Sequence, residues 1–258
     1  MKKLILIVSV IFSIFTSCTR DDNKTEDTTN QYVLVTKWTE TFANGNVYTA
    51  TYSYDNGNQI NQIKYDVDNS YSKYTYTNNL ITKIEQFRSD NSLSSVTTLE
   101  YDNLNRLIKE ITIEDRDFET LTFTSNYTHN GDKNTITEQY EDRSNINNEI
   151  NTAEKIYYIK DNEIFKTVYP FNNYITEFSY KADHNPFKNI LGFDKIYFSF
   201  YFGEKGNQKN IDTKISPEAT EYNTYNSYNT QGYPTEIIQK YTKYKTNSTK
   251  KIKIEYTL

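Results

Sequence analysis

The stretch Val47-Tyr48-Thr49-Ala50-Thr51-Tyr52-Ser53-Tyr54-Asp55-Asn56-Gly57-Asn58-Gln59-Ile60-Asn61-Gln62-Ile63 decides the fold of this chain. From Tyr48 to Tyr54, tyrosine or alanine alternates with threonine or serine. A period of two predicts a strand with one face on a core and the other in water. The Asp/Asn/Gly cluster that follows tolerates the positive φ angles of tight turns, and aliphatic residues then begin a return strand. The stretch therefore predicts a β-hairpin.

The same unit recurs along the chain. Tyr101 to Ile111 and Tyr228 to Ile237 repeat it, and looser copies begin at four further tyrosines: Tyr76, Tyr127, Tyr158 and Tyr180. Successive anchor tyrosines lie 22, 25, 26, 31, 22 and 48 residues apart. Two strands of about ten residues each, with their turns, fill the shorter gaps. The last gap therefore holds an additional element, and we expect a longer loop from Asp183 to Phe193.

The composition supports an all-β fold. The chain has 34 Thr, 31 Asn, 26 Ile and 25 Tyr but only 5 Ala and 11 Leu, so it favours strands and turns over helices. This excludes a helical bundle and disfavours a parallel α/β fold. Consecutive hairpins predict an antiparallel up-and-down meander of about a dozen strands. We expect it to curl into a barrel or a half-barrel, with Tyr, Phe and Ile on the concave side.

The N-terminus has the pattern of a secretion signal. Met1-Lys2-Lys3 is positively charged, and the 12 residues from Leu4 to Phe15 form an almost unbroken apolar run. A membrane-spanning helix needs about 20 apolar residues, so this run is too short to be one. The run ends in Phe15-Thr16-Ser17-Cys18, which resembles a bacterial lipobox. That resemblance implies cleavage before Cys18 and acylation of its thiol and amine; an ordinary signal with an incidental cysteine is the alternative.

These features divide the chain into three parts. We expect a lipoprotein signal peptide in residues 1–17, an acylated cysteine and flexible tether in residues 18–31, and a single β domain in residues 32–258. The tether lacks large apolar residues and cannot collapse. Its acidic pair, Asp21-Asp22, resembles the export signal of surface lipoproteins, although a charged linker would look the same. We therefore expect an outer-membrane lipoprotein, exposed on the cell surface and attached to the membrane through its lipid.

Few residues point to catalysis or to a metal. The two histidines, His129 and His184, fall in separate hairpins, and the sole cysteine is assigned to the anchor, so we expect no metal site. Phosphate-loop, dinucleotide and nucleophile-elbow motifs do not occur, so we predict no cofactor, no catalytic residue and no enzymatic activity. The net charge of −5 without a basic cluster argues against nucleic acid as a partner.

The aromatic residues allow two interpretations. Tyrosine and tryptophan provide rigid stacking surfaces for sugars or peptides. They also form the ordinary cross-strand pairs of a sheet. The residues we consider as a ligand platform are Trp38, Tyr52, Tyr54, Tyr76 and Tyr101.

The repeats also carry a resemblance to known families. The Tyr-Asp units resemble the YD repeats of the Rhs-type family, which build extended antiparallel sheets. The whole arrangement, from the lipobox to the last strand, resembles more closely a bacteroidete-type family of lipoproteins of unknown function, described as porin-like in fold, and in the β domain the resemblance covers roughly residues 32–258. The shared features are the lipobox, the Tyr-Asp hairpins, Asn185-Pro186-Phe187 after Asp183-His184, and Gly232-Tyr233-Pro234 before a last Tyr-rich strand.

The resemblance carries no known activity, and the lipid anchor, the hairpin repeats and the lack of catalytic motifs together predict a non-catalytic scaffold or binding module of the cell envelope. Its ligand would be a glycan, a peptide or another envelope protein. Two alternatives stay open: an outer-membrane β-barrel and a glycan-acting hydrolase. Membrane strands need an apolar lipid-facing side, whereas one alternating face here carries Thr, Asn, Lys and Glu.

Overall fold

The computed structural model describes residues 32–116, 119–132, 134–146, 149–199, 203–244 and 246–257. The predicted signal peptide, Cys18 and the tether lie outside these residues. Within them, sixteen strands and two short 3-10 helices are formed. The elements are β1 (Val35–Phe42), β2 (Val47–Asp55), β3 (Gln59–Tyr65), β4 (Tyr71–Thr77), β5 (Leu80–Phe87), β6 (Leu93–Tyr101), β7 (Leu107–Arg116), β8 (Glu119–His129), β9 (Thr135–Ser144), β10 (Ile150–Lys160), β11 (Glu163–Tyr169), β12 (Tyr174–His184), η1 (Phe193–Lys195), η2 (Gly203–Gly206), β13 (Lys209–Ile215), β14 (Ala219–Tyr228), β15 (Pro234–Lys243) and β16 (Thr246–Tyr256).

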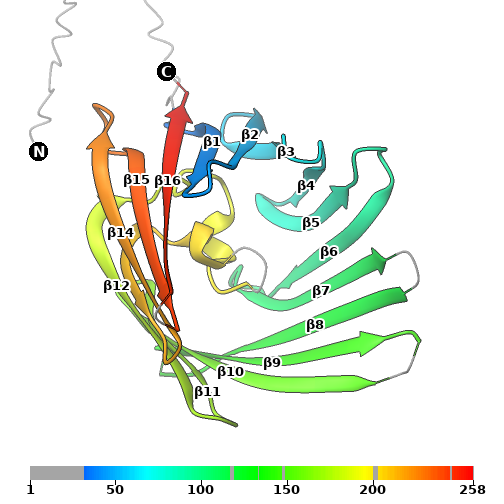
Figure 1. Ribbon diagram of the computed structural model, residues 1–258. Coiled ribbons are helices and arrows are strands. Elements are labelled where there is room, and N and C mark those ends of the chain that lie inside the picture. Colours follow the sequence, from blue (N-terminus) through cyan, green and yellow to red (C-terminus); the bar gives the residue numbers. More distant parts are fainter. Residues whose placement is uncertain are drawn as a thin grey trace, which may run out of the picture. The chain divides into compact units, whose positions relative to one another are not determined.

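The strands form one closed antiparallel barrel. Each strand pairs with its neighbours in the sequence, and β16 pairs with β1 to close the sheet, with Trp38 opposite Ile254 (Figure 1). The prediction of an all-β antiparallel meander is confirmed, and its curl is a full barrel. The described strands number sixteen rather than about a dozen, because every anchor tyrosine closes a complete hairpin and β15–β16 adds one more.

The turns owe their shape to asparagine. Asn56 has a φ angle of 47°, and both central residues of the turns Asn78-Asn79 and Asp161-Asn162 have positive φ angles. Asparagine and aspartate tolerate this left-handed region better than other residues with a side chain. Much of the asparagine content therefore serves the hairpin turns, as the sequence predicts.

Alternation along the strands separates an apolar interior from a polar outer wall. In β2, Ala50 and Tyr52 are buried, whereas Thr51 and Ser53 are exposed. Ion pairs join neighbouring strands across the outer wall: Lys37–Glu255 at 3.8 Å, Lys251–Glu236 at 2.6 Å and Lys109–Glu100 at 4.0 Å. Among the described residues, no helix is long and apolar enough to cross a membrane.

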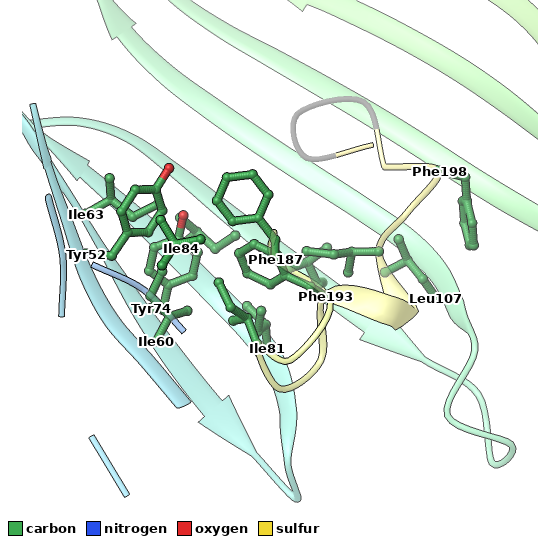
Figure 2. Packing of buried hydrophobic residues seen from close by; sticks show 14 of the residues in the cluster. Tyr52, Ile60, Ile63, Tyr74, Ile81, Ile84, Leu107, Phe187, Phe193 and Phe198 are labelled. Atoms are coloured by element: carbon green, nitrogen blue, oxygen red, sulfur yellow. The ribbon is translucent and has the colours of Figure 1, made fainter. Parts of the chain in front are cut away.

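The segment between β12 and β13 fills part of the barrel. We call its described residues, 185–199 and 203–208, the plug; it lies inside the curve of the strands (Figure 1). The expected loop thus begins after His184 and runs to residue 208, further than Phe193. Its apolar side chains belong to the core together with those of the wall: Phe187, Ile190, Phe193, Ile196 and Phe198. Figure 2 shows Phe187 and Phe193 beside Tyr52, Tyr74 and Ile81.

Hydrogen bonds hold the plug at the end of the barrel where the Tyr-Asp turns lie. The backbone nitrogen of Leu191 donates to the carbonyl oxygen of Asn58 at 3.0 Å. The Asn58 side-chain amide donates in return to the carbonyl oxygen of Asn189 at 2.7 Å. The plug is therefore tied to the β2–β3 turn by bonds in both directions.

Tyrosines on five of the even-numbered strands act as latches at the same end. Their hydroxyl groups donate to carbonyl oxygens at the start of the preceding strand: Tyr54 to Val35, Tyr101 to Ile81, Tyr180 to Ile164, Tyr225 to Ile211 and Tyr256 to Pro234, all at 2.6–2.8 Å. At β8, the Nε2 atom of His129 lies 2.8 Å from the Leu107 carbonyl oxygen. In β14 a bulge after Tyr225 gives the latch to that residue rather than to Tyr228. We call these five tyrosines the tyrosine latches, together with Tyr76, whose hydroxyl group donates to the Leu191 carbonyl oxygen of the plug.

Candidate ligand-binding cleft

A cavity of about 230 Å³ lies between the plug and the inner wall of the barrel. We call it the inner cleft. Strands β1, β2 and β13 to β16 contribute its wall, and the plug contributes the remainder. Its lining residues are Trp38, Tyr52, Asn185, Pro186, Phe187, Lys205, Asn210, Ile211, Glu221, Asn223, Tyr225, Ile237, Gln239, Lys250 and Ile252.

Aromatic rings from the wall and the plug meet at the inner cleft. Trp38 stacks on Phe187 with ring centroids 5.3 Å apart and planes inclined by 30°. Tyr52 approaches the same phenylalanine at 5.7 Å. The alternation of β1 and β2 directs Trp38 and Tyr52 inward, and the plug brings Phe187 to them. Such rings offer flat apolar faces to a ligand.

A network of amide side chains forms the polar part of the cleft. The Gln239 Nε2 atom donates to Glu221 Oε1 at 2.7 Å and to Asn223 Oδ1 at 3.0 Å. The Asn223 Nδ2 atom also donates to Glu221 Oε1, at 3.1 Å. Asn223 and Gln239 are opposite each other in the β14–β15 ladder. The network therefore presents donors and acceptors from a rigid sheet.

Two lysines reach the inner cleft, and only one is neutralised by a carboxylate among the described residues. Lys250 Nζ lies 2.9 Å from Glu40 Oε1, which also accepts a 3.0 Å bond from Trp38 Nε1. Lys205 Nζ lies 5.8 Å from the centre of the Phe187 ring. Burial lowers the pKa of Lys205, and the charge of Glu40 partly opposes this shift.

The inner cleft adjoins further hollows along β14 to β16. One, of about 410 Å³, shares Gln239 and Lys250 with the cleft and is also lined by Tyr241. Another, of about 200 Å³, shares Glu221 with the cleft and contains the same Tyr241. A ligand larger than the inner cleft could therefore extend along this wall.

The structure divides the aromatic residues considered as a ligand platform into two groups. Trp38 and Tyr52 line the inner cleft. Tyr54, Tyr76 and Tyr101 instead give their hydroxyl groups to backbone carbonyls as latches. Sequence reasoning did not single out Lys205 or Gln239, because nothing in the local pattern shows that β15 and the plug meet.

A second polar cluster lies in the interior beside β7 to β10. Tyr157 donates to Glu138 Oε2 at 2.6 Å, and Ser125 donates to Glu138 Oε1 at the same distance. Tyr127 donates to Glu110 Oε2 at 3.0 Å. Burial, followed by the neighbouring carboxylates, raises the pKa of Tyr127 and Tyr157. Both tyrosines therefore stay protonated and donate to one oxygen atom each of Glu110 and Glu138.

Glu163 fixes the other end of the plug. Its Oε1 atom accepts bonds from the backbone nitrogens of Gln208 at 3.1 Å and Lys209 at 2.8 Å. Burial raises the pKa of Glu163 to about 7, against the opposing effect of these bonds and of the Lys209 charge. Among the described residues, no group of three or more His, Cys, Asp or Glu is placed to hold a metal ion.

Comparison with solved structures finds two porin-like proteins. The chain is similar to a porin-like protein from Bacteroides vulgatus ATCC 8482, with a TM-score of 0.56 and 14% identity, over 88% of this chain and 99% of that chain. It is also similar to a porin-like protein from Bacteroides uniformis ATCC 8492, with a TM-score of 0.42 and 9% identity, over 86% and 96% of the two chains. No protein-family model and no curated protein matches. The first likeness establishes a porin-like fold.

Proposed function

We propose that this chain is a lipid-anchored protein of the cell envelope whose barrel binds a ligand in the inner cleft without transforming it. The ligand is a saccharide or a short peptide. The observation that carries the proposal is the inner cleft itself, where Trp38 and Phe187 lie together with the amide of Gln239. Ligand sites generally combine apolar and aromatic walls with a few fixed polar groups.

The outer wall argues for a barrel surrounded by water. Lys37 and Glu255 pair across β1 and β16, and Lys251 pairs with Glu236 on the next strand. A lysine facing lipid at the centre of a bilayer costs about 2–4 kcal/mol. The buried apolar side chains of the wall, by contrast, form one core with those of the plug. The lipid on Cys18, rather than the strands, would then hold the protein at the outer membrane, and the acidic tether would place it on the cell surface.

The membrane attachment has its own test. Cells that produce the full chain or its Cys18→Ser variant are given a radioactive fatty acid. We expect label on the native chain and none on the variant. An unlabelled native protein would refute the lipid anchor while leaving ligand binding open.

Ligand binding can be read from Trp38, which is the only tryptophan of the chain. Neutral and acidic oligosaccharides and short peptides are titrated while tryptophan emission is recorded. Gln239→Ala removes a lining amide, whereas Lys240→Ala changes the next residue, which is exposed. We expect saturable changes in emission, with affinity about tenfold lower in Gln239→Ala and unchanged in Lys240→Ala. Equal affinities in the two variants, or no saturable change with any compound, would contradict the proposal.

A further inference from the structure

We propose that the ligand of the inner cleft is an acidic saccharide whose anionic group binds the ammonium group of Lys205. This inference rests on the proposed ligand binding and names the chemistry of the ligand. It follows from the position of Lys205, from the partners of the other charged groups, and from the polar network beside them.

The plug holds Lys205 in a fixed position. The next residue, Gly206, packs so closely on η1 that an added Cβ atom would lie 2.3 Å from the Phe193 carbonyl oxygen. The backbone that carries Lys205 is therefore pressed against the core. Its side chain is half-buried and lines the inner cleft, with the ammonium group on the side of the Phe187 ring.

The other charged groups of the cleft already have partners. Glu40 binds Lys250 and Trp38. Glu221 accepts two amide hydrogen bonds on one oxygen and is shared with the hollow beside Tyr241. Within the part of the chain that the structure describes, no carboxylate lies within ion-pair distance of Lys205. A cation enclosed in this way gains most from an anion supplied by a ligand.

Burial lowers the pKa of Lys205, with Glu40 acting in the opposite direction. An anion at the ammonium group would offset the effect of burial and favour the charged form. Charge-assisted hydrogen bonds are roughly twice as strong as neutral ones. An acidic ligand should therefore bind more tightly than its neutral counterpart.

The polar network favours a saccharide over a fatty acid. A fatty acid would place its acyl chain against Asn223 and Gln239 and leave their bonding capacity unused. A sugar ring can stack its apolar face on Trp38 and give its hydroxyl groups to the amides. The cleft combines both kinds of surface with a cation, which is the chemistry of a sugar that carries a carboxylate or a sulfate.

Calorimetry on the mature full chain in lipid nanodiscs tests this inference. The probes are trigalacturonate, its methyl ester, a sulfated oligosaccharide and octanoate. The variants are Lys205→Met, Lys205→Arg and, as a matched control, Lys240→Met on the exposed side of β15. Circular dichroism confirms that each variant is folded. The ester replaces each carboxylate by a neutral methyl ester on the same sugar backbone, so the pair tests the contribution of the anionic group.

We expect at least one acidic sugar to bind about 10- to 100-fold more tightly than a neutral one. This preference should disappear in Lys205→Met and persist in Lys205→Arg and Lys240→Met. Preference for the sulfated probe over trigalacturonate would identify sulfate as the anionic group. Equal binding of acid and ester, unchanged in Lys205→Met, would overturn the inference but leave the proposed function standing. Binding of octanoate alone would refute a saccharide ligand. Binding of none of these probes, together with no saturable change in tryptophan emission with any oligosaccharide or peptide, would refute the proposed function as well.

Discussion

The hydroxyl group of Tyr76 donates a 3.1 Å hydrogen bond to the carbonyl oxygen of Leu191 and accepts a 3.2 Å bond from the backbone nitrogen of Ile60. One side chain thus joins β4, β3 and the plug. Burial raises the pKa of Tyr76, so the hydroxyl stays protonated and can donate at physiological pH. Tyr76 therefore connects the hairpin repeat of the barrel wall to the plug.

We predict that Tyr76→Phe destabilises the barrel by about 1–3 kcal/mol, because two buried backbone groups lose their partner. Denaturant unfolding monitored by circular dichroism measures this change. Tyr222→Phe is the matched control, because Tyr222 is half-exposed to solvent, at 50%. The control should change stability by less than about 0.5 kcal/mol. Similar effects of the two variants would show that the latch contributes nothing specific.

The plug should also be sensitive to the size of residue 206. A Cβ atom on Gly206 would meet the backbone of Phe193 at 2.3 Å and of Tyr197 at 2.6 Å. Backbone atoms cannot move aside as a flexible side chain does, so Gly206→Ala should lower the free energy of unfolding by about 3 kcal/mol. Gly131→Ala is the control, because nothing lies within 4 Å of its added atom. A stable Gly206→Ala protein would contradict the close packing of the plug.

The hairpins were predictable because their signal is local. Tyr54-Asp55-Asn56-Gly57 sets both the end of a strand and the φ angles of the turn, and neighbouring strands pair through these turns. The polar outer wall follows from the same alternation. Closure of the barrel was not predictable, because the pairing of Trp38 with Ile254 joins the two ends of the domain. No local pattern encodes that contact.

The burial of the plug has a signal in the sequence, which the prediction of a loop from Asp183 to Phe193 did not take into account. Phe187, Ile190 and Phe193 recur at every third residue in the segment expected to be a longer loop, Ile196 continues this spacing just beyond it, and all four are buried. A loop with that spacing of large apolar residues is expected to pack against another apolar surface of the protein. The inner cleft around Lys205 and Gln239, by contrast, is lined by the plug and by strands from both ends of the domain, β1, β2 and β13 to β16, and becomes visible only in three dimensions.

The stability of the barrel should depend on pH through Glu163. Its pKa rises from 4.5 to about 7 on burial, so the folded state binds the proton more tightly than the unfolded state. That stabilisation is fully present below pH 4.5 and is lost as the pH rises through about 7. We expect a loss on the order of 1–2 kcal/mol, after allowance for solvent screening, from this group.

Unfolding free energies measured across this pH range test the assignment. Glu163→Gln keeps an oxygen that can accept from the Gln208 and Lys209 amides but cannot ionise, so it should remove this contribution. Glu177→Gln, at an exposed position on β12, should retain the native pH profile. A native profile that persists in Glu163→Gln would assign the pH dependence to other groups.

Tyr157 and Tyr158, which are neighbours on β10, allow the hydrogen bond to the buried Glu138 side chain to be tested. Tyr157 donates to it at 2.6 Å, whereas Tyr158 projects to the opposite face of β10 and packs on Phe165. Tyr157→Phe should destabilise the protein by about 1–3 kcal/mol, because a buried oxygen atom of Glu138 loses its hydrogen-bond donor. Tyr158→Phe should have an effect below about 0.5 kcal/mol. Thermal and denaturant unfolding measure both changes. A larger loss of stability in Tyr158→Phe than in Tyr157→Phe would contradict this prediction.

The central claim is that the barrel turns its polar wall to water and keeps its apolar side chains and its ligand site inside. Sedimentation velocity in detergent-free buffer tests it most directly, on a chain whose residues 1–18 are replaced by a cleavable secretory signal without a cysteine. We predict a single monomeric species with a β-sheet circular dichroism spectrum and cooperative unfolding. A protein that stays dispersed only in detergent would contradict the claim and indicate strands that face lipid.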